Sequence, residues 1–250
     1  LPLQTFDATQ EYAYFTCCTQ AYDPRNRRVV RDTVRVLRAA GVSFGLLGGA
    51  ERCCGDAVRK AGGESLFQGL AAHNVNVLEG LGARKVLVPS PHCLNTFRKE
   101  YGELGAKWQS THVVELLAEK VKSGDLVLKN AVPAKVLYHD PCYLGRHCGV
   151  YDAPRTVLSA VPGVELMEFE RNRADAVCCG GGGGRLWMET PVAERFAVLK
   201  LKEAAARGAD TIATACPYCI SMFEDAKTAL GMDGIRIADV VELAAGALQE

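Results

Sequence analysis

The sequence contains the stretch Ala176-Val177-Cys178-Cys179-Gly180-Gly181-Gly182-Gly183-Gly184, in which two adjacent cysteines open into five glycines. Adjacent cysteines rarely form a disulfide with each other, because the eight-membered ring strains the peptide bond between them. Adjacent thiolates can instead bind neighbouring irons of one metal cluster. Glycines have no side chain, so the N–H groups of this run, Gly180 and Gly181 first, can approach an anionic cluster closely. The stretch therefore predicts a metal-cluster site.

Further cysteines lie on both sides of this stretch. Asp140-Pro141-Cys142 precedes it and Ala215-Cys216-Pro217-Tyr218-Cys219 follows it. Such spacing is typical of a metal site. The candidate ligands are Cys142, Cys178, Cys179, Cys216 and Cys219. A zinc site and an ordinary cubane cluster each use four ligands. Five thiolates therefore indicate an iron–sulfur cluster of more open shape, with a structural zinc site and one spare thiol as the alternative.

The same pattern occurs earlier in the chain. Cys18, Cys53-Cys54-Gly55 and Ser90-Pro91-His92-Cys93 precede their counterparts by 124 to 126 residues, and flanking residues repeat as well. A steady offset indicates an internal duplication, with units at residues 12–121 and 134–250. One ligand position differs, because Ser90 stands where the second copy has Cys216. The first unit thus offers four metal ligands for a cluster, a zinc ion or a weakened site: Cys18, Cys53, Cys54 and Cys93.

Further cysteines and histidines lie beside these motifs. Cys17 and Cys148 fall outside the repeat, and we interpret them as small buried residues rather than as extra ligands or redox thiols. We expect His92 to pack or hydrogen-bond near the first site rather than to replace a ligand. His139 and His147 flank Cys142 and are the candidate catalytic residues, since either can hydrogen-bond a cluster, donate a proton or face a substrate.

The composition is that of an ordinary soluble globular protein, with 48% hydrophobic and 23% charged residues in a chain of 250. The 29 basic and 29 acidic residues balance, which gives no electrostatic reason to expect nucleic acid as a partner. We find no signal peptide and no apolar run of about 18 residues that would span a bilayer. The eleven cysteines indicate thiol ligands in a reducing, cytoplasmic compartment rather than disulfides.

Apolar runs alternate with helical periodicity in both copies. Strands are expected at residues 12–17, 42–47, 85–89, 135–138, 164–169 and 211–214. Helices are expected at 23–41, 66–81, 113–121, 191–207 and 238–248, and also after Pro91, near Pro154 and from Cys216. This alternation predicts an α/β protein made of two pseudo-symmetric Rossmann-like units with parallel sheets. Ligands bind outside the carboxyl ends of such strands, so each unit should gather its cysteines at one edge.

These motifs resemble the duplicated cysteine-rich CCG domain family, which includes the B and D polypeptides of heterodisulfide reductase and related iron–sulfur oxidoreductases. The string Tyr138-His139-Asp140-Pro141-Cys142-Tyr143-Leu144-Gly145-Arg146-His147 looks most like the D-like, ETF:quinone oxidoreductase type. The resemblance implies a non-cubane [4Fe–4S] cluster on the five cysteines of the second unit. It implies a second [4Fe–4S] cluster or a zinc ion in the first unit, where Ser90 departs from the pattern.

The resemblance also implies an iron–sulfur electron-transfer subunit of a multi-component oxidoreductase. Electrons would pass between a flavoprotein or ferredoxin-like iron–sulfur partner and a quinone or disulfide acceptor. A membrane cytochrome or quinone-reducing partner would associate the chain with a membrane. Two alternatives stay open: a reductase that cleaves a disulfide directly at the cluster, and a zinc-stabilised interaction module without redox activity.

Overall fold

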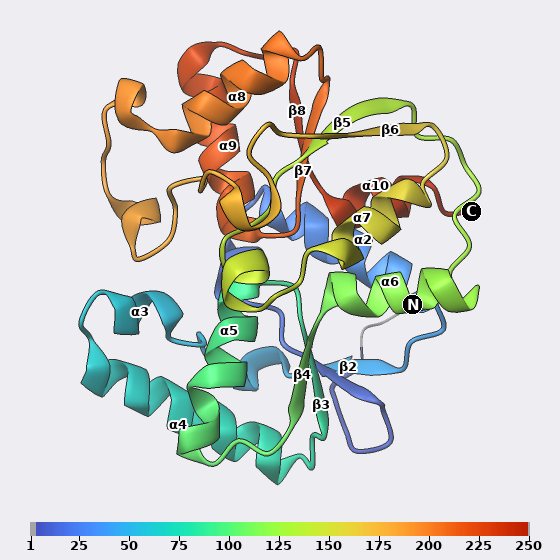
Figure 1. Ribbon diagram of the computed structural model, residues 1–250. Coiled ribbons are helices and arrows are strands. Elements are labelled where there is room, and N and C mark those ends of the chain that lie inside the picture. The colour runs from blue at the N-terminus through green and yellow to red at the C-terminus, as the bar shows by residue number, and fades with distance from the viewer. Residues whose placement is uncertain (1–3, 250) are drawn as a thin grey trace.

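Two parallel four-stranded sheets organise the computed structural model, which describes residues 4–249 (Figure 1). The first sheet has the order β2-β1-β3-β4, with strands β1 (Tyr12–Tyr14), β2 (Phe44–Leu46), β3 (Lys85–Val88) and β4 (Gln109–His112). The second has the order β6-β5-β7-β8, with strands β5 (Ala134–Tyr138), β6 (Val164–Glu168), β7 (Thr211–Thr214) and β8 (Arg236–Asp239). Corresponding strands occupy corresponding places, which confirms the prediction of two pseudo-repeated Rossmann-like units.

Helices connect the parallel strands in both units, as parallel pairing requires. The first unit contains α1 (Cys18–Tyr22), α2 (Asn26–Ala39), α3 (Asp56–Lys60), α4 (Glu64–Gly80), α5 (Pro91–Lys99) and α6 (Val113–Ser123). The second contains α7 (Asp152–Ser159), α8 (Phe196–Ala206), α9 (Pro217–Leu230) and α10 (Val240–Gly246). Short turns of helix complete the chain: η1 (Gly48–Ala50), η2 (Tyr101–Leu104), η3 (Tyr143–His147), η4 (Arg173–Asp175), η5 (Arg185–Trp187) and η6 (Val192–Glu194).

The fourth strand of each sheet was not predicted. β4 has the sequence QSTH and β8 the sequence RIAD, and neither carries an apolar run. Each becomes a strand by pairing with a buried neighbour, β4 with β3 and β8 with β7. The helix predicted over 191–207 begins only at Phe196, because the segment after Pro191 forms the short turn η6 first. The helix predicted from residue 238 begins at Val240, after β8.

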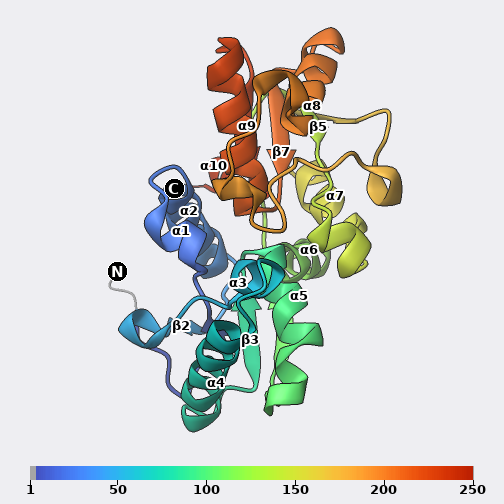
Figure 2. The same ribbon diagram turned by 90° about the vertical axis from the view of Figure 1, so that its left-hand side faces the viewer.

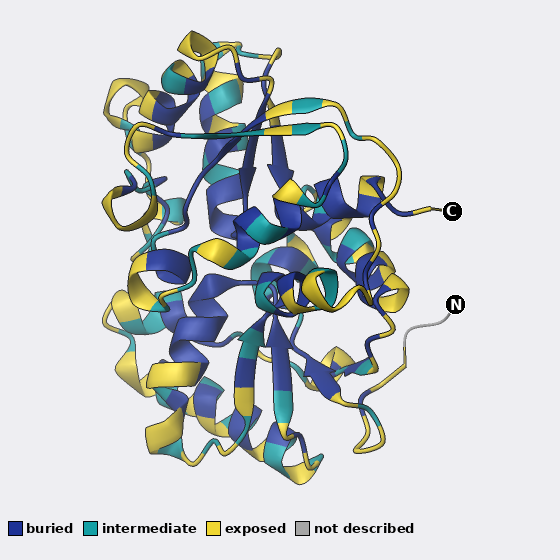
Figure 3. Cartoon of the chain, turned by 45° about the vertical axis from the view of Figure 1, so that its right-hand side comes forward, coloured by how far each residue is buried: buried dark blue, intermediate teal, exposed yellow. Residues whose placement is uncertain are grey.

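The two units pack against each other through equivalent helices. α2 of the first unit contacts α10 of the second, and α7 of the second contacts α6 of the first. The carboxyl ends of both sheets point toward the middle of the molecule (Figure 2). One hydrophobic core includes Leu37 and Leu117 from the first unit and Leu158 and Val241 from the second, and Figure 3 shows the buried residues along both sheets. The residues that follow the strands therefore meet between the units.

The segment between α6 and β5 is tied to the turn that follows α10. The N–H groups of Lys129 and Asn130 both donate to the carbonyl oxygen of Ala247. Across residues 4–249, no helix combines the length and apolar character needed to cross a membrane.

Candidate metal centres

Strand ends and helix starts position the cysteines of the second unit. Cys142 follows β5, and Cys216 follows β7 as the N-cap of α9. Pro217 occupies the first position of α9, where its missing N–H costs no hydrogen bond. Cys219 then lies in the first turn of α9, and Cys178 and Cys179 lie in the loop that follows η4. The N-terminus of α9 faces these sulfurs with the positive end of its dipole, which favours thiolates.

All five predicted ligands of the second unit come together. The sulfur atoms of Cys142 and Cys178 are 3.8 Å apart, and those of Cys179 and Cys219 are 3.2 Å apart. The side chain of Cys216 contacts that of Cys219. Hydrogen bonds from Cys142 and Cys179 lower the pKa of the Cys178 thiol, which favours the thiolate form of Cys178. These five residues form the second cysteine set.

The first unit repeats this geometry. The sulfur atoms of Cys18 and Cys53 are 3.5 Å apart, and the side chain of Cys54 contacts that of Cys93. Hydrogen bonds from Cys18 and Cys54 lower the pKa of the Cys53 thiol to about 3. Cys53 thus corresponds to Cys178, and the pKa of each thiol is lowered by its cysteine neighbours. The four predicted residues therefore form a first cysteine set that matches the second pair for pair.

Cys17 also belongs to the first set, although its position lies outside the repeat. Its side chain is 2% exposed and contacts the side chains of Cys18, Cys93 and Ser90. The interpretation as a small buried residue was right about its burial but missed these neighbours. The only signal in the sequence was its place next to Cys18. Cys148, by contrast, is only partly buried, and the charged groups that affect its pKa belong to Arg98, Lys99 and Glu115.

Two equivalent glycines place backbone donors at the sulfur atoms. Gly55 and Gly180 have φ angles of 84° and 93°, a left-handed conformation that glycine adopts without strain. The N–H of Gly55 donates to Cys53 Sγ at 3.4 Å, and that of Gly180 donates to Cys178 Sγ at 3.3 Å. At Gly181, an added Cβ would lie 2.8 Å from Met222 Cγ, so a larger residue there would force the Met222 side chain to shift.

The two candidate catalytic histidines lie in different surroundings. His139 is 1% exposed, and neither of its ring nitrogens has a hydrogen-bond partner within residues 4–249. A ring nitrogen of His139 and the sulfurs of Cys179 and Cys219 lie within 4.8 Å of one another. Burial lowers the pKa of His139 to about 4, so the ring is neutral. His147 is exposed and packs on the ring of Tyr143, with 4.6 Å between ring centroids.

His92 connects the two cysteine sets. Its Nδ1 lies 2.8 Å from Asp56 Oδ2, and its side chain hydrogen-bonds Cys216 of the second unit. Its ring centroid is 4.0 Å from that of Tyr143 and 4.2 Å from that of Tyr218. Burial lowers the pKa of His92, but the hydrogen bonds with Asp56 and Cys216 outweigh it and raise the pKa to about 9. A buried, positively charged ring therefore lies beside the second set.

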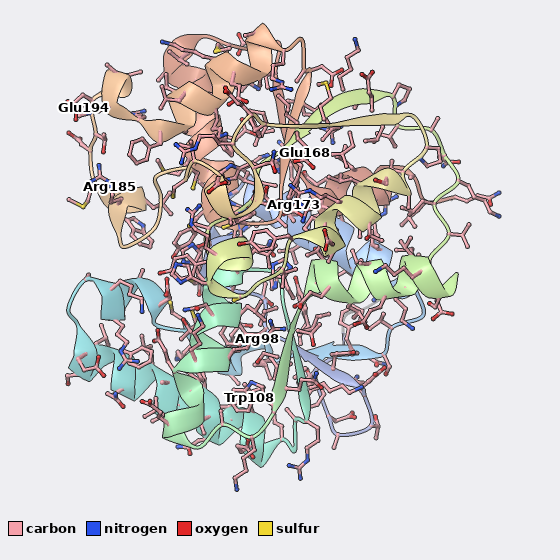
Figure 4. The ribbon with its side chains drawn as sticks, viewed as in Figure 1. Arg98, Trp108, Glu168, Arg173, Arg185 and Glu194 are labelled. Carbon is pink, nitrogen blue, oxygen red and sulfur yellow. The ribbon has the colours of Figure 1, made fainter. Side chains whose placement is uncertain are left out.

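An ion-pair network fixes the loops that carry Cys142 and Cys178. Arg155 binds Asp140 at 2.8 Å and Glu168 at 2.7 Å. The backbone N–H of Arg173 donates to Asp140 Oδ2 at 2.7 Å, and Figure 4 shows Glu168 and Arg173 on neighbouring segments. Asp140 therefore ties the loop after β5 to the segment that leads to Cys178. Sequence reasoning did not assign this role, because it depends on contacts between distant segments.

Cavities adjoin the first cysteine set and the glycine that follows the cysteine pair of the second set. A cavity of about 360 Å³ next to Gly180 is lined by Arg185, Glu194 and Met222, and Figure 4 shows the first two on the protruding loop. Two cavities of about 400 and 560 Å³ are lined in part by Cys18. The first set is thus accessible from solvent at Cys18.

The donor atoms fit a thiolate-bound metal cluster. Each unit presents several thiols within contact distance of one another, and the structure forms no disulfide among the described cysteines. Buried polar atoms without partners in the described chain lie beside both sets: the ring nitrogens of His139 and the hydroxyl of Ser90. A bound cluster would give such atoms a partner, since ligand sulfurs and sulfides accept hydrogen bonds.

Comparison with known proteins gives consistent matches. The profile of the cysteine-rich domain CCG matches residues 12–98 and 136–224. The chain is 39% identical over 236 residues to the "Probable iron-sulfur-binding oxidoreductase FadF" of Bacillus subtilis, with 94% of this chain and 34% of that protein covered. It is 36% identical over 241 residues to "EtfAB:quinone oxidoreductase" of Syntrophomonas wolfei, with 93% and 34% covered.

A third relative is the D polypeptide of the dihydromethanophenazine:CoB–CoM heterodisulfide reductase of Methanosarcina mazei. It is 37% identical over 244 residues, with 95% of this chain and 59% of that protein covered. The chain spans about a third of the length of the first two relatives. The paired cysteine sets, the repeated topology and these matches together show that the chain belongs to the cysteine-rich CCG domain family and carries two copies of its domain.

Proposed function

We propose that this chain is an iron–sulfur electron-transfer unit of a multi-component oxidoreductase. The observation that carries the proposal is the convergence of five cysteines in the second unit, with sulfur–sulfur distances of 3.8 and 3.2 Å. Five thiols exceed the four that zinc or a cubane cluster uses. We therefore assign a non-cubane [4Fe–4S] cluster to Cys142, Cys178, Cys179, Cys216 and Cys219. When bound, such a cluster supplies one-electron redox chemistry.

The surrounding residues set the conditions of that chemistry. The N–H of Gly180 donates to Cys178, and the protonated ring of His92 hydrogen-bonds Cys216. Hydrogen-bond donors to the ligand sulfurs raise the reduction potential of a cluster. The neutral ring of His139 is available to ligand or hydrogen-bond the cluster, so we assign it a supporting role in place of a proton-donating one. For the first unit we propose a second [4Fe–4S] cluster, with zinc as the alternative.

The names of the relatives support a proposal for the redox partners of this chain. Their names include an EtfAB:quinone oxidoreductase and a component of a heterodisulfide reductase. We propose that electrons pass between a flavoprotein or ferredoxin-like iron–sulfur partner and a quinone or disulfide acceptor. Because this chain spans about a third of the first two relatives, we assign the donor and acceptor sites to partner domains or subunits. We place the chain in the reducing cytoplasm, joined to the membrane through such a partner.

Metal analysis of protein purified without oxygen tests this function. We expect the protein to contain iron and an equal amount of acid-labile sulfide. We also expect visible absorbance at about 400 nm that bleaches on reduction. Cys178→Ala should lose the cluster of the second unit, whereas Cys148→Ala, outside both sets, should keep it. Zinc without labile sulfide would contradict electron transfer and favour the interaction module. Turnover of a disulfide by this chain alone with an artificial donor would favour the direct reductase.

A further inference from the structure

Each of the two cysteine sets contains five cysteines. Four of them are equivalent in the two units, but the fifth occupies a different position of the repeat in each unit. The repeat pairs Ser90 with Cys216, so the first unit lacks a thiol where the second has one. It pairs Cys17 with Pro141, so the first unit has a thiol where the second has none. Within the first unit, one position therefore has serine where the second unit has cysteine, and another has cysteine where the second unit has proline.

The structure brings these two positions together. The side chain of Cys17 contacts that of Ser90, although 73 residues separate them along the chain. Ser90 is fully buried, and its hydroxyl has no hydrogen-bond partner among residues 4–249. Both Ser90 and Cys216 are extended N-cap residues, of α5 and α9, so Ser90 is placed as a ligand would be. The thiol of Cys17 therefore lies beside Ser90, which cannot supply a thiol.

Cys17 also reproduces one contact of Cys216. Cys216 contacts Cys219 and His92, and the equivalents of these two residues are Cys93 and Tyr218. Cys17 contacts Cys93. The thiol of Cys17 thus contacts the equivalent of Cys219, as the thiol of Cys216 contacts Cys219 itself.

The backbone at Cys17 has the conformation that this placement needs. Its φ angle is 73°, in the left-handed region that residues other than glycine rarely adopt. The side chain of Glu51 holds the turn, because its two carboxyl oxygens accept the N–H groups of Thr16 at 2.7 Å and of Cys17 at 2.9 Å. Consecutive side chains of an extended chain point apart. The left-handed turn instead lets the thiols of Cys17 and Cys18 join one set.

We propose that Cys17 is a metal ligand of the first unit and takes the place that Cys216 has in the second. The first unit then holds five thiolates and takes the same open [4Fe–4S] cluster as the second, with Ser90 as a hydrogen-bond donor to its sulfur. Thiolate is the softer ligand and suits iron–sulfur clusters better than the hydroxyl of serine. This inference rests on the proposed function, because it assigns a residue to the same kind of cluster.

The test uses Cys17→Gly, alone and combined with Ser90→Cys, in the complete chain purified without oxygen. Glycine tolerates the φ angle of 73°, so Cys17→Gly removes the thiol without adding backbone strain. The readouts are iron and acid-labile sulfide per chain. We expect about eight irons in the wild type, about four in Cys17→Gly and about eight again in the double variant. Cys148→Ala, the matched control outside both sets, should keep about eight irons.

Each other outcome also decides the proposal. If Cys17→Gly contains as much iron per chain as the wild type, whether about four or about eight, the ligand role of Cys17 is overturned. The proposed function would still stand. Failure of Ser90→Cys to restore iron would overturn the equivalence with Cys216. If Cys17→Gly alone does not fold, the iron content of the double variant with Ser90→Cys decides the proposal. Zinc without labile sulfide in the wild type would overturn the proposed function, and an unchanged zinc content in Cys17→Gly would then overturn the ligand role as well.

Discussion

His92 and Tyr218 occupy equivalent positions in the two repeats, and each reaches toward the cysteines of the other unit. Their ring centroids are 4.2 Å apart. His92 hydrogen-bonds Cys216, whereas Tyr218 lies near Cys17 and other thiols of the first set. The second set thus receives a positively charged donor, and the first set faces a neutral phenol whose pKa is raised mainly by burial. This difference should separate the reduction potentials of the two centres.

Replacement of His92 by phenylalanine tests this difference. His92→Phe keeps an aromatic ring in the stack but removes the donor to Cys216. A hydrogen bond to a charged group is worth about 1.5–3 kcal/mol, and about 59 mV corresponds to a tenfold change for one electron. We therefore expect the reduction potential of the second centre to fall by about 60–130 mV in a potentiometric titration followed by electron paramagnetic resonance.

His147→Phe is the control for this experiment. His147 also packs on Tyr143, but it is exposed, and within residues 4–249 it makes no hydrogen bond to a cysteine of either set. Its replacement should leave both potentials unchanged. An unchanged potential in His92→Phe would show that the contact with Cys216 does not tune the centre.

At the scale of single elements, the last helix of each unit begins with an equivalent capping box that uses a different residue. α6 is capped by His112 with Glu115, and α10 by Asp239 with Glu242. Nδ1 of His112 accepts the N–H of Val114 at 3.2 Å, and Nε2 lies 3.0 Å from the carbonyl oxygen of Pro89. His112 can make both bonds only as a neutral ring that carries its proton on Nε2.

The cap of α6 should make stability depend on pH. Burial lowers the pKa of His112 to about 3, whereas its ordinary value is 6.5. Below pH 6.5 the unfolded chain takes up a proton that the folded chain excludes, so this contribution to stability is lost as the pH falls toward 3. Between about pH 6.5 and about pH 5 the loss is about 2 kcal/mol. His112→Asn keeps a capping oxygen and cannot titrate, so it should remove this loss in urea unfolding at the two pH values.

The cap of α10 supplies the matching control, because its pH dependence has the opposite sign. Burial raises the pKa of Asp239 from 3.8 to about 8. The folded chain then keeps a proton that the unfolded chain releases, and stability is lost as the pH rises from about 4 to about 8. Asparagine cannot titrate, so Asp239→Asn should remove this loss. The free energy of unfolding at about pH 7, measured relative to that at about pH 5, should therefore be higher in Asp239→Asn than in the wild type. Equal pH dependence in the wild type and both variants would show that neither cap titrates as expected.

At the scale of the whole molecule, Arg25 links the two units. It lies at the start of α2 and binds Glu242 of α10 at 2.8 Å and Glu224 of α9 at 3.0 Å. Its guanidinium also donates to the carbonyl oxygen of Ile237 at 2.7 Å. The side chain of Glu242 is 9% exposed, so it depends on Arg25 for its counter-charge. Together with the continuous core, this bridge should make the units unfold as one.

Replacement of Arg25 by methionine should lower the free energy of unfolding by about 2–3 kcal/mol, because Glu242 is left buried and unpaired. Glu224→Ala removes only the more exposed partner and should cost less than about 1 kcal/mol. Unfolding is followed by circular dichroism for the whole chain and by Trp108 fluorescence in a Trp187→Phe background for the first unit. The two midpoints should coincide and fall together in Arg25→Met. Separate transitions would contradict the single cooperative core.

Local patterns in the chain were enough to predict the duplication, the parallel α/β units and nine of the cysteines in the two sets, because regular spacing and strand–helix alternation are properties of neighbouring residues. The roles of short or solitary features depended on the folded arrangement instead. The polar strands β4 and β8 form by pairing with buried neighbours. Cys17 joins the first set through a left-handed turn held by Glu51, and His92 reaches Cys216 only because the sheets face each other across one core. Such contacts join residues far apart in the sequence, where no local pattern records them.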